Sequence, residues 1–427
     1  MKTKTDKPAL IPRLRFPEFQ NSGEWEVKRL GEVFKLQDGY SFSSKELSHK
    51  ANDDESYQVV RITEINNKNK NEDKVYISYE TVKKNNLECF KITKGDLLLS
   101  LTGAAGFNFF IWNDNKEAFL NQRTLKLVPK EENNNSIKYL VEPLLFKKIN
   151  SFGTGQNNNL SKSILENLKL PLPPLPEQQK IADCLSSLDA LITAGRQKLQ
   201  ALKDHKKGLL QNLFPREGET LPKLRFPEFQ NSGEWEVKRL EDFGYFIRGL
   251  TYSSKDVSDD GLLVIRAGNI KNQNLVLDDD LVFVNKKIHK ELYLKAGDIV
   301  ICMSSGSRSL VGKNAEYVGN YPTDLTVGAF CSIFRTDNRL MKYIFQTRAY
   351  EKFISLSIGE GNIKNLSDTD LELYEFFVPE IPAEQQKIAA CLSSLDDLIN
   401  AQTQKIELLE LHKKGLLQGL FPQLSEL

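Results

Sequence analysis

Apolar residues recur in alternating steps of four and three along two segments of the chain, 177–215 and 384–422. This heptad spacing predicts two long helices, each with a narrow apolar seam that faces a partner helix. The expected seam positions are Ile181, Leu185, Leu188, Ile192, Leu199, Leu202 and Leu209 in the first segment, and Ile388, Leu392, Leu395, Ile399, Ile406, Leu409 and Leu416 in the second. A helix that packs only on its own globular block is the competing interpretation, but it usually carries a wider apolar stripe.

Polar or small residues interrupt both seams at the same two places, Gly195 with Gln402 and Lys206 with Lys413. Proline-rich stretches precede both segments, and Leu-Phe-Pro ends both. Proline suits the turn before a helix and cannot continue it. Each helix is therefore expected to have roughly 37 residues, or about 55 Å at 1.5 Å per residue.

Short apolar runs bounded by Gly, Asn and Asp fill the blocks that precede the two helices. The expected strands are 59–62, 75–77, 97–100, 107–111 and 124–128 in block one, and 263–266, 281–284, 299–302, 312–318 and 330–334 in block two. A helix is expected after each set, over 137–149 and over 340–354. The pattern predicts an α/β (α+β) fold with curled mixed sheets and a few helices.

The chain is an internal repeat. LRFPEFQNSGEWEVKRL occupies both Leu14–Leu30 and Leu224–Leu240, an offset of 224 − 14 = 210 residues, and EQQKIA begins at both Glu177 and Glu384, an offset of 384 − 177 = 207. The blocks between these segments have diverged, so two different modules share one frame. The expected domains are 1–175 with a short tail 1–12, a helix 176–216, a second block 217–382 and a second helix 383–427.

Composition narrows the class of protein. The net charge of +1 in 427 residues provides no global field for nucleic acid, so any such surface must be local. Five cysteines without paired spacing favour a reducing cytoplasm, and the repeated Cys184 and Cys391 are expected to be core thiols. The N-terminus has no apolar signal region, and the most apolar stretch, 97–112, is interrupted by glycines and is too short to span a bilayer.

The sequence carries no complete catalytic motif. Ser151–Gly155 resembles an FxGxG loop for S-adenosylmethionine, but a helix is expected before it where that loop needs a strand. Gly306–Lys313 departs from the P-loop spacing, and the four histidines have no metal-ligand spacing. We therefore expect a non-catalytic chain that binds neither cofactor nor metal.

Loops rich in small polar and basic residues recur at equivalent places in the two blocks. Such side chains read base edges and hold phosphates, but composition alone favours ordinary solvated loops, and it is the resemblance given below that favours DNA contact for these loops as sets. The candidate DNA-binding residues are Ser43, Ser44, Lys45, Arg61, Thr102, Arg123, Gln156, Asn157, Asn158 and Lys162 in block one, and Arg248, Ser253, Ser254, Lys255, Arg266, Ser305, Arg308, Asn362, Lys364 and Asn365 in block two.

These features, taken in order and in duplicate, resemble the specificity (S) subunit of type I restriction–modification systems. They are LRFPEF with a tryptophan at the start of each block, a Gly-Asp pair before a mid-block apolar strand, a Gly/Asn-rich loop ending in Leu-Ser, and a Pro-rich hinge into EQQKIA. The resemblance implies two pseudo-symmetric target-recognition domains joined by two long antiparallel coiled-coil helices. It covers nearly the whole chain.

The resemblance also implies a function and partners. Each domain would read one half of an asymmetric bipartite site on double-stranded DNA, while the helices set the spacing and hold two methyltransferase (M) subunits. Motor–nuclease (R) subunits would join the full complex. S-adenosylmethionine, ATP and Mg would bind those partners in a bacterial or archaeal cytoplasm, at the nucleoid and away from membranes.

Two other functions are compatible with parts of the pattern. One is a coiled-coil scaffold that binds only proteins, which would give no salt-sensitive shift of DNA. The other is the specificity module of a fused methyltransferase–nuclease, which the missing motifs disfavour. Binding of labelled S-adenosylmethionine by the isolated chain would support that alternative.

Overall fold

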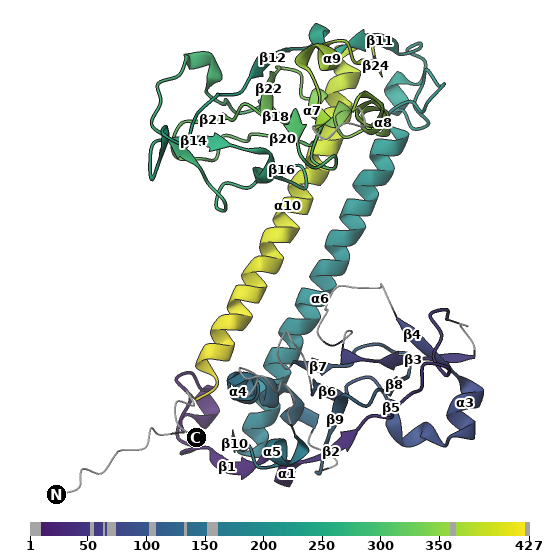
Figure 1. Ribbon diagram of the computed structural model, residues 1–427, viewed down its shortest axis with the longest axis vertical. Helices are drawn as coiled ribbons and strands as arrows, with labels where there is room; N and C mark the ends of the chain where they lie inside the picture. The colour runs from purple at the N-terminus through teal and green to yellow at the C-terminus, as the bar shows by residue number, and fades with distance from the viewer. Residues whose placement is uncertain are drawn as a thin grey trace, which may run out of the picture. The chain divides into compact units, whose positions relative to one another are not determined.

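Two compact units make up the chain in the computed structural model, which describes residues 10–51, 55–62, 65, 74–101, 108–131, 135–151, 161–358 and 364–422. Unit 1 comprises Met1–Gly195 with Lys405–Leu427, and unit 2 comprises Arg196–Gln404 (Figure 1). The long helices α6 (Leu175–Asn212) and α10 (Pro382–Gly419) each pass from one unit to the other. Each unit therefore combines one globular block with the first part of one helix and the last part of the other.

The block of unit 1 contains two four-stranded sheets. The antiparallel sheet has the order β2 (Phe34–Asp38), β9 (Thr124–Pro129), β6 (Leu97–Ser100), β7 (Phe109–Ile111). The mixed sheet has the order β4 (Val75–Ser78), β3 (Ser56–Val60), β8 (Ala118–Leu120), β5 (Lys91–Ile92), with β3 and β8 parallel. A separate pair joins β1 (Glu26–Arg29) to β10 (Lys169–Leu172). The helices are α1 (Leu30–Val33), α3 (Tyr79–Lys84), α4 (Lys138–Ser151) and α5 (Lys162–Glu166).

Unit 2 repeats the antiparallel sheet and the three core strands of the mixed sheet, and it differs at the edges of the mixed sheet. Its antiparallel sheet has the order β12 (Tyr245–Arg248), β22 (Cys331–Arg335), β18 (Ile299–Cys302), β20 (Asn314–Glu316). Its mixed sheet has the order β13 (Val257–Ser258), β17 (Phe283–Val284), β14 (Leu262–Ile265), β21 (Leu325–Val327), with β14 and β21 parallel. Three short pairs are β11 (Glu236–Arg239) with β24 (Glu375–Val378), β15 (Ile270–Lys271) with β16 (Asn274–Leu275), and β19 (Ser304–Ser305) with β23 (Lys364–Asn365).

The α/β class is confirmed, and the expected curled sheet of each block consists of one antiparallel and one mixed sheet. Short 3-10 turns complete the description of both units: Pro17–Phe19, Leu87–Phe90, Asn135–Ile137, Pro227–Phe229, Leu240–Asp242, Ala267–Asn269 and Lys290–Leu292.

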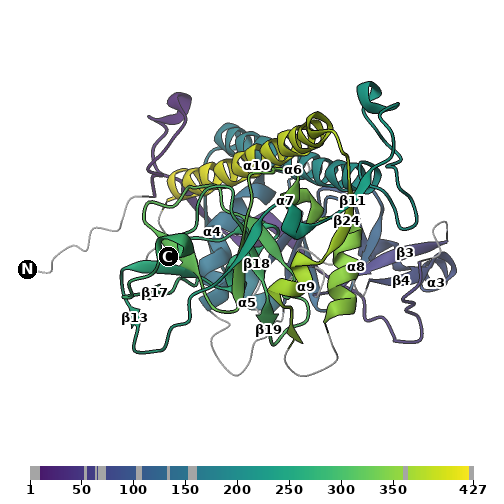
Figure 2. The ribbon, with the colours of Figure 1, turned by 90° about the horizontal axis from the view of Figure 1, so that it is seen from above.

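The single helix expected over 340–354 is wrong, because the chain forms α7 (Met341–Ile344) and α8 (Arg348–Ser357) instead. The Thr347 hydroxyl accepts a hydrogen bond from the Tyr350 amide at 3.3 Å, so Thr347 is the N-cap of α8. N-capping residues adopt extended backbone and begin a new helix. Helix α9 (Asp368–Glu372) follows, and Figure 2 shows α7 beside α10.

The core of each unit draws on both long helices. In unit 1, Ile181 and Leu185 of α6 pack with Leu420 and Phe421, which follow α10, and with the block itself. In unit 2, Ile388 and Leu392 of α10 pack with Leu213 and Phe214, which follow α6. The first seam positions of each helix are therefore part of a block's core.

The expectation of core thiols at Cys184 and Cys391 is wrong, because both are only half-buried and it is Cys302 and Cys331 that are buried. The buried pair faces across β18 and β22. Along the described part of the chain, no helix is long and apolar enough to cross a membrane.

Candidate nucleic-acid interface and helix frame

Two of the polar loops expected to face nucleic acid meet in unit 2. Strand β19 pairs with β23, which places Ser304 opposite Asn365 and Ser305 opposite Lys364. The Ser304 hydroxyl lies 2.5 Å from Asn365 Oδ1, and the Leu366 amide donates to the Met303 carbonyl at 2.8 Å. Two loops whose paired residues are 61 positions apart in sequence thus lie side by side (365 − 304 = 61).

Arg248 lies at the end of β12 beside this pair of loops. Its Nε donates a 2.7 Å hydrogen bond to Asp368 Oδ2, and the buried Ser332 hydroxyl donates to Asp368 Oδ1 at 2.7 Å. Asp368 is the first residue of α9, whose N-cap is Ser367. The hydrogen bond to Asp368 raises the pKa of Arg248. Sequence reasoning selected Arg248 and missed Asp368, because the pairing depends on strand β12 meeting the start of α9.

The equivalent pair in unit 1 has the opposite polarity. Asp38 ends β2 as Arg248 ends β12 (248 − 38 = 210), and Lys162 begins α5 as Asp368 begins α9. Lys162 Nζ lies 3.0 Å from Asp38 Oδ2. The same backbone position therefore presents an acid in one unit and an arginine in the other.

The serine-rich turns after these strands are alike in the two units. The Ser43 amide donates to Glu46 Oε2 at 2.8 Å, and the Ser253 amide donates to Asp256 Oδ2 at 2.7 Å. The backbone and hydroxyl hydrogen bonds from Ser253 lower the pKa of Asp256. The neighbouring candidates Ser44, Lys45, Ser254 and Lys255 are all exposed.

The remaining candidate arginines differ in how they are held. Arg266 forms an ion pair with Asp280 at 2.6 Å, and one Nη of Arg308 donates to the Ser355 carbonyl at 2.8 Å. Arg123 is exposed and Arg61 is half-buried. The candidates Thr102, Gln156, Asn157, Asn158 and Asn362, the side chain of Lys364 and most of the FxGxG-like segment lie outside the described residues.

A buried ion pair links the repeated LRFPEF and EQQKIA segments within each unit. In unit 1, Arg15 Nε and Nη2 each donate to Glu177 at 2.7 Å, and Nη1 donates to the Gly23 carbonyl at 2.7 Å. In unit 2, Arg225 binds Glu384 in the same bidentate way, at 2.7 and 2.8 Å. The pairing raises the pKa of both arginines. Sequence reasoning missed these pairs, although their duplication was the available signal.

The same repeated segment also holds the end of the other long helix. The Trp25 ring meets Phe421 edge-on with centroids 6.1 Å apart, and Trp235 meets Phe214 in the same way at 6.1 Å. The Leu14 amide donates to the Gly419 carbonyl at 2.8 Å. Each copy of the identical segment therefore joins the beginning of one helix to the end of the other, which explains why the frame repeats while the blocks differ.

The two lysines that interrupt the seams each find an aspartate on the opposite helix. Lys206 Nζ lies 2.7 Å from Asp396 in unit 2, and Lys413 Nζ lies 2.6 Å from Asp189 in unit 1. The residue numbers of both pairs have the same sum (206 + 396 = 413 + 189 = 602), so both belong to one antiparallel register. A polar residue at a seam position selects register at a cost in stability.

The expected seam positions are buried or half-buried on both helices. Those that are buried are Ile181, Leu185, Leu188, Ile192, Ile388, Leu392, Leu395 and Ile406. Those that are half-buried are Leu199, Leu202, Leu209, Ile399, Leu409 and Leu416.

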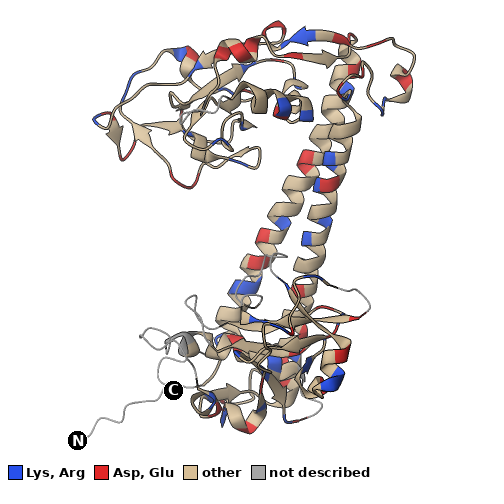
Figure 3. Ribbon diagram, turned by 45° about the vertical axis from the view of Figure 1, so that its right-hand side comes forward, with Lys and Arg blue, Asp and Glu red and all other residues tan. Residues whose placement is uncertain are grey.

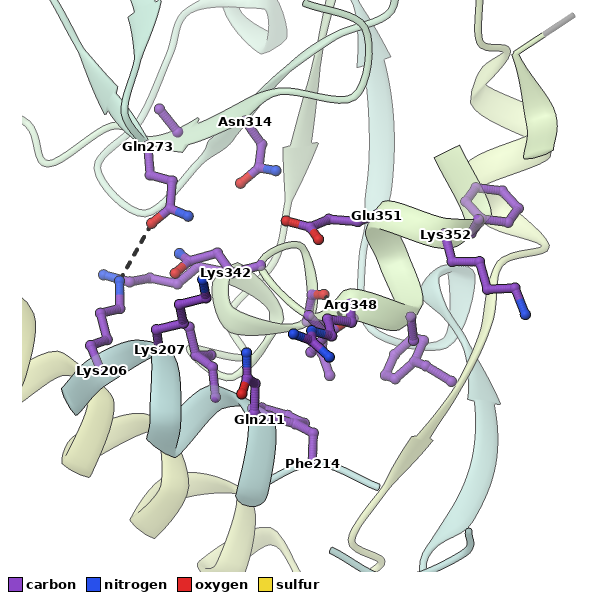
Figure 4. A pocket seen from close by; sticks show the side chains of 18 of the residues that line it. Lys206, Lys207, Gln211, Phe214, Gln273, Asn314, Lys342, Arg348, Glu351 and Lys352 are labelled. Carbon is purple, nitrogen blue, oxygen red and sulfur yellow. Dashed lines mark hydrogen bonds between the residues drawn. The ribbon is translucent and has the colours of Figure 1, made fainter. Parts of the chain in front are cut away.

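A cavity of about 1830 Å³ lies in unit 2 among the end of α6, the loop after β15, α7 and α8 (Figure 4). Lys206 donates to Gln273 Oε1 at 3.4 Å across it. Lys342 lies 2.9 Å from Glu316 and 3.2 Å from Asp396, and the Tyr343 hydroxyl donates to Asp396 at 2.9 Å. These charges pair with one another and hold this part of the cavity wall in place.

Burial acts to raise the pKa of Asp396, but hydrogen bonding to Lys206 and the charges of Lys206 and Lys342 outweigh it, so the pKa is lowered. Asp396 therefore remains ionised and holds α6, α7 and α10 together. Within the described residues, no group of three or more His, Cys, Asp or Glu could hold a metal ion.

Comparisons with known proteins identify the class. The model of the type I restriction modification DNA specificity domain matches twice, over residues 22–204 and 232–411. The chain therefore belongs to the family of specificity subunits of type I restriction–modification systems.

Individual relatives agree with this assignment. The chain is 27% identical to the type I restriction enzyme MjaVIII specificity subunit of Methanocaldococcus jannaschii, over 95% of this chain and 93% of that protein. It is 34% identical to the type I restriction enzyme EcoKI specificity subunit of Escherichia coli, over 38% of this chain and 36% of that protein. The crystal structure of the S subunit from M. genitalium has the same fold, with a TM-score of 0.64 at 14% identity over 97% of this chain and 100% of that one.

Proposed function

We propose that each block reads one half of an asymmetric bipartite site on double-stranded DNA. The observation that carries this proposal is a contrast between two kinds of contact. The contacts between the repeated segments are the same in both units, whereas the ion pairs at the ends of β2 and β12 differ. Arg15–Glu177 and Arg225–Glu384 are the same contact, whereas Asp38–Lys162 and Arg248–Asp368 reverse the charge at one position. Two blocks that share the same supporting contacts but carry different side chains at these strand ends suit recognition of two unrelated half-sites, because side-chain donors and acceptors discriminate base pairs.

The paired helices set the spacing in this proposal. Each helix has 38 residues, or about 57 Å at 1.5 Å per residue. One turn of B-DNA is roughly 34–36 Å, so a spacer of this length covers about one and a half turns and can separate two half-sites in successive major grooves. The register pairs Lys206–Asp396 and Lys413–Asp189 support this role, because they hold one alignment of the two helices.

The exposed faces of the helices are the proposed platform for two methyltransferase subunits. Charges of both signs are mixed along these faces (Figure 3). The outward residues of α6 are Lys180, Asp183, Arg196, Lys198, Lys203, Asp204 and Lys207, all exposed. Motor–nuclease subunits would complete the assembly in the cytoplasm, and partner subunits would carry S-adenosylmethionine, ATP and Mg. The chain itself would be non-catalytic.

The test is to express the chain with its methyltransferase and sequence the methylated bases of the host. We expect one bipartite motif with two unrelated halves and a fixed spacer. The purified complex should shift DNA containing that motif, and the shift should weaken steeply with salt. Methylation at a palindromic motif, or none beyond that of the methyltransferase alone, would contradict the proposal.

A further inference from the structure

Arg248 combines a fixed side chain with a free hydrogen-bonding end. Its Nε is bound to Asp368 at 2.7 Å, yet its side chain is 80% exposed. Neither Nη atom has a protein partner among the described residues. The free end of the guanidinium group therefore points away from the contact that holds the side chain.

The supporting contacts of Arg248 are themselves held. Asp368 has a side chain only 16% exposed, and it accepts a second hydrogen bond from Ser332 at 2.7 Å. Ser332 is buried and lies directly opposite Arg248 in the β12–β22 pairing. Arg248 thus lies at the end of β12. Its side chain is held by Asp368 at the start of α9, and Asp368 is held in turn by Ser332 on the neighbouring strand β22.

This geometry suits a ligand that presents two neighbouring hydrogen-bond acceptors. A guanidinium group has five N–H donors in a planar fork, and fixing Nε leaves the two Nη groups side by side. Guanine presents two acceptors, N7 and O6, in the major groove, and arginine binds them in a bidentate manner. Bracing the side chain beforehand also reduces the entropy lost when it binds.

The two other candidate arginines of unit 2 lack this combination. Arg308 has one Nη engaged by the Ser355 carbonyl, and Arg266 donates through Nη2 to Asp280. In unit 1 the position equivalent to Arg248 carries Asp38, whose carboxylate has no donor of its own.

We propose that Arg248, positioned by Asp368, reads a guanine in the half-site bound by unit 2. The proposal rests on the proposed DNA-reading function and names one base type for one position. The equivalent position of unit 1 does not read guanine, because Asp38 offers only acceptors when ionised.

The test is selection of bound DNA from a library with both half-sites randomised, using the complex with its methyltransferase. The variants are Arg248→Gln, Arg248→Lys and Asp368→Asn, and Arg339→Gln is the matched control because Arg339 is an exposed arginine of the same unit. We expect the wild-type complex to require guanine at one position of one half-site. Arg248→Gln should lower that preference on the order of 10- to 100-fold and leave every other position unchanged.

The two milder variants separate base reading from a general charge effect. Arg248→Lys keeps the charge but loses the two Nη donors, so it should lose most of the guanine preference. Asp368→Asn should lose part of this preference. The control Arg339→Gln should lose none of it. Unchanged guanine preference in Arg248→Gln, or uniform weakening across all sequences, overturns the proposal, since the latter marks a phosphate contact. A wild-type complex that selects a bipartite motif without such a guanine overturns this inference alone. One that selects no bipartite motif overturns the proposed function as well.

Discussion

Arg15 and Glu177 show how one residue pair can hold a whole module on its frame. Their side chains are 5% and 1% exposed, and they meet through two 2.7 Å hydrogen bonds. A buried ion pair contributes little relative to apolar residues of the same size, but removing one partner leaves a charge without compensation. The pair is therefore a constraint on geometry more than a source of stability.

Arg15→Met should destabilise unit 1 by about 3–5 kcal/mol, because Glu177 would remain buried without its partner. Hydrogen exchange of peptides from β1 and the start of α6 measures this locally. Arg13→Met is the matched control and should change little, because Arg13 is exposed. The double variant Arg15→Met with Glu177→Leu should recover most of the lost stability. If it recovers none, the destabilisation does not come from the unpaired charge of Glu177.

The element that links the two units is a helix pair with polar positions inside its seam. Lys206 and Asp396 have side chains 11% and 21% exposed, so water screens their attraction only partly. A shift of one helix by a heptad would separate Lys206 from Asp396 and Lys413 from Asp189 together. The pairs therefore favour one register over neighbouring ones that the leucines alone would tolerate.

Asp396→Asn should destabilise the contact among α6, α7 and α10 by about 1–3 kcal/mol, allowing for partial exposure. Because the folded pKa of Asp396 is lowered from 3.8, its contribution is fully present above that pH and disappears as the pH falls through the folded pKa. The difference between wild type and variant, followed by hydrogen exchange, should therefore shrink in acid. Asp397→Asn, an exposed neighbour, should show no such difference at any pH.

Replacing Leu188 and Leu395 with Asp tests the seam itself. Both side chains are 9% exposed, so the changes bury two unpaired charges at a cost of several kcal/mol. Assembly with the methyltransferase should fail while the blocks remain folded, as size-exclusion chromatography and the near-ultraviolet signal of the tryptophans would report. The same substitution at the exposed Leu191 and Leu398 changes the proposed methyltransferase platform but not the seam, so hydrogen exchange of α6 and α10 in the chain alone should stay unchanged for that control pair and rise for Leu188 and Leu395. An intact complex with Asp at both seam positions would refute the seam assignment.

At the scale of the whole molecule, the repeat and the heptads were enough to predict the class and the presence of both long helices. The observed helices end at Asn212 and Gly419, a few residues before the expected ends. The same periodicity could not show that Lys206 and Lys413 meet aspartates, because that requires the antiparallel register. The break before α8 was missed because the apolar spacing continues through it, while the capping hydroxyl of Thr347 acts locally. Asp368 was missed because β12 and α9 meet only in the folded unit.

The exchange of residues 31–175 with 241–382 tests the modular organisation as a whole. The exchanged ranges exclude Arg15, Glu177, Arg225 and Glu384, so both frame contacts survive. They keep Asp38 with Lys162 and Arg248 with Asp368. Both blocks also carry a Lys-Tyr pair where α4 and α7 begin, at 138–139 and 342–343, so the tyrosine beside Asp396 is retained. We therefore expect a folded protein.

The methylated motif of this chimera should contain the same two half-sites in swapped order, with the spacer unchanged because the helices are unchanged. A control chimera that exchanges only 31–100 with 241–302 separates the two ion pairs Asp38–Lys162 and Arg248–Asp368. It places Asp38 with Asp368 and Arg248 with Lys162. Like charges then replace ion pairs, so this chimera should lose the recognition that the full exchange keeps. Sequencing of methylated bases reads all three proteins in one host. A full exchange that still methylates the original motif, or that alters the spacer by several base pairs, would show that the blocks are not independent readers on a fixed helix pair.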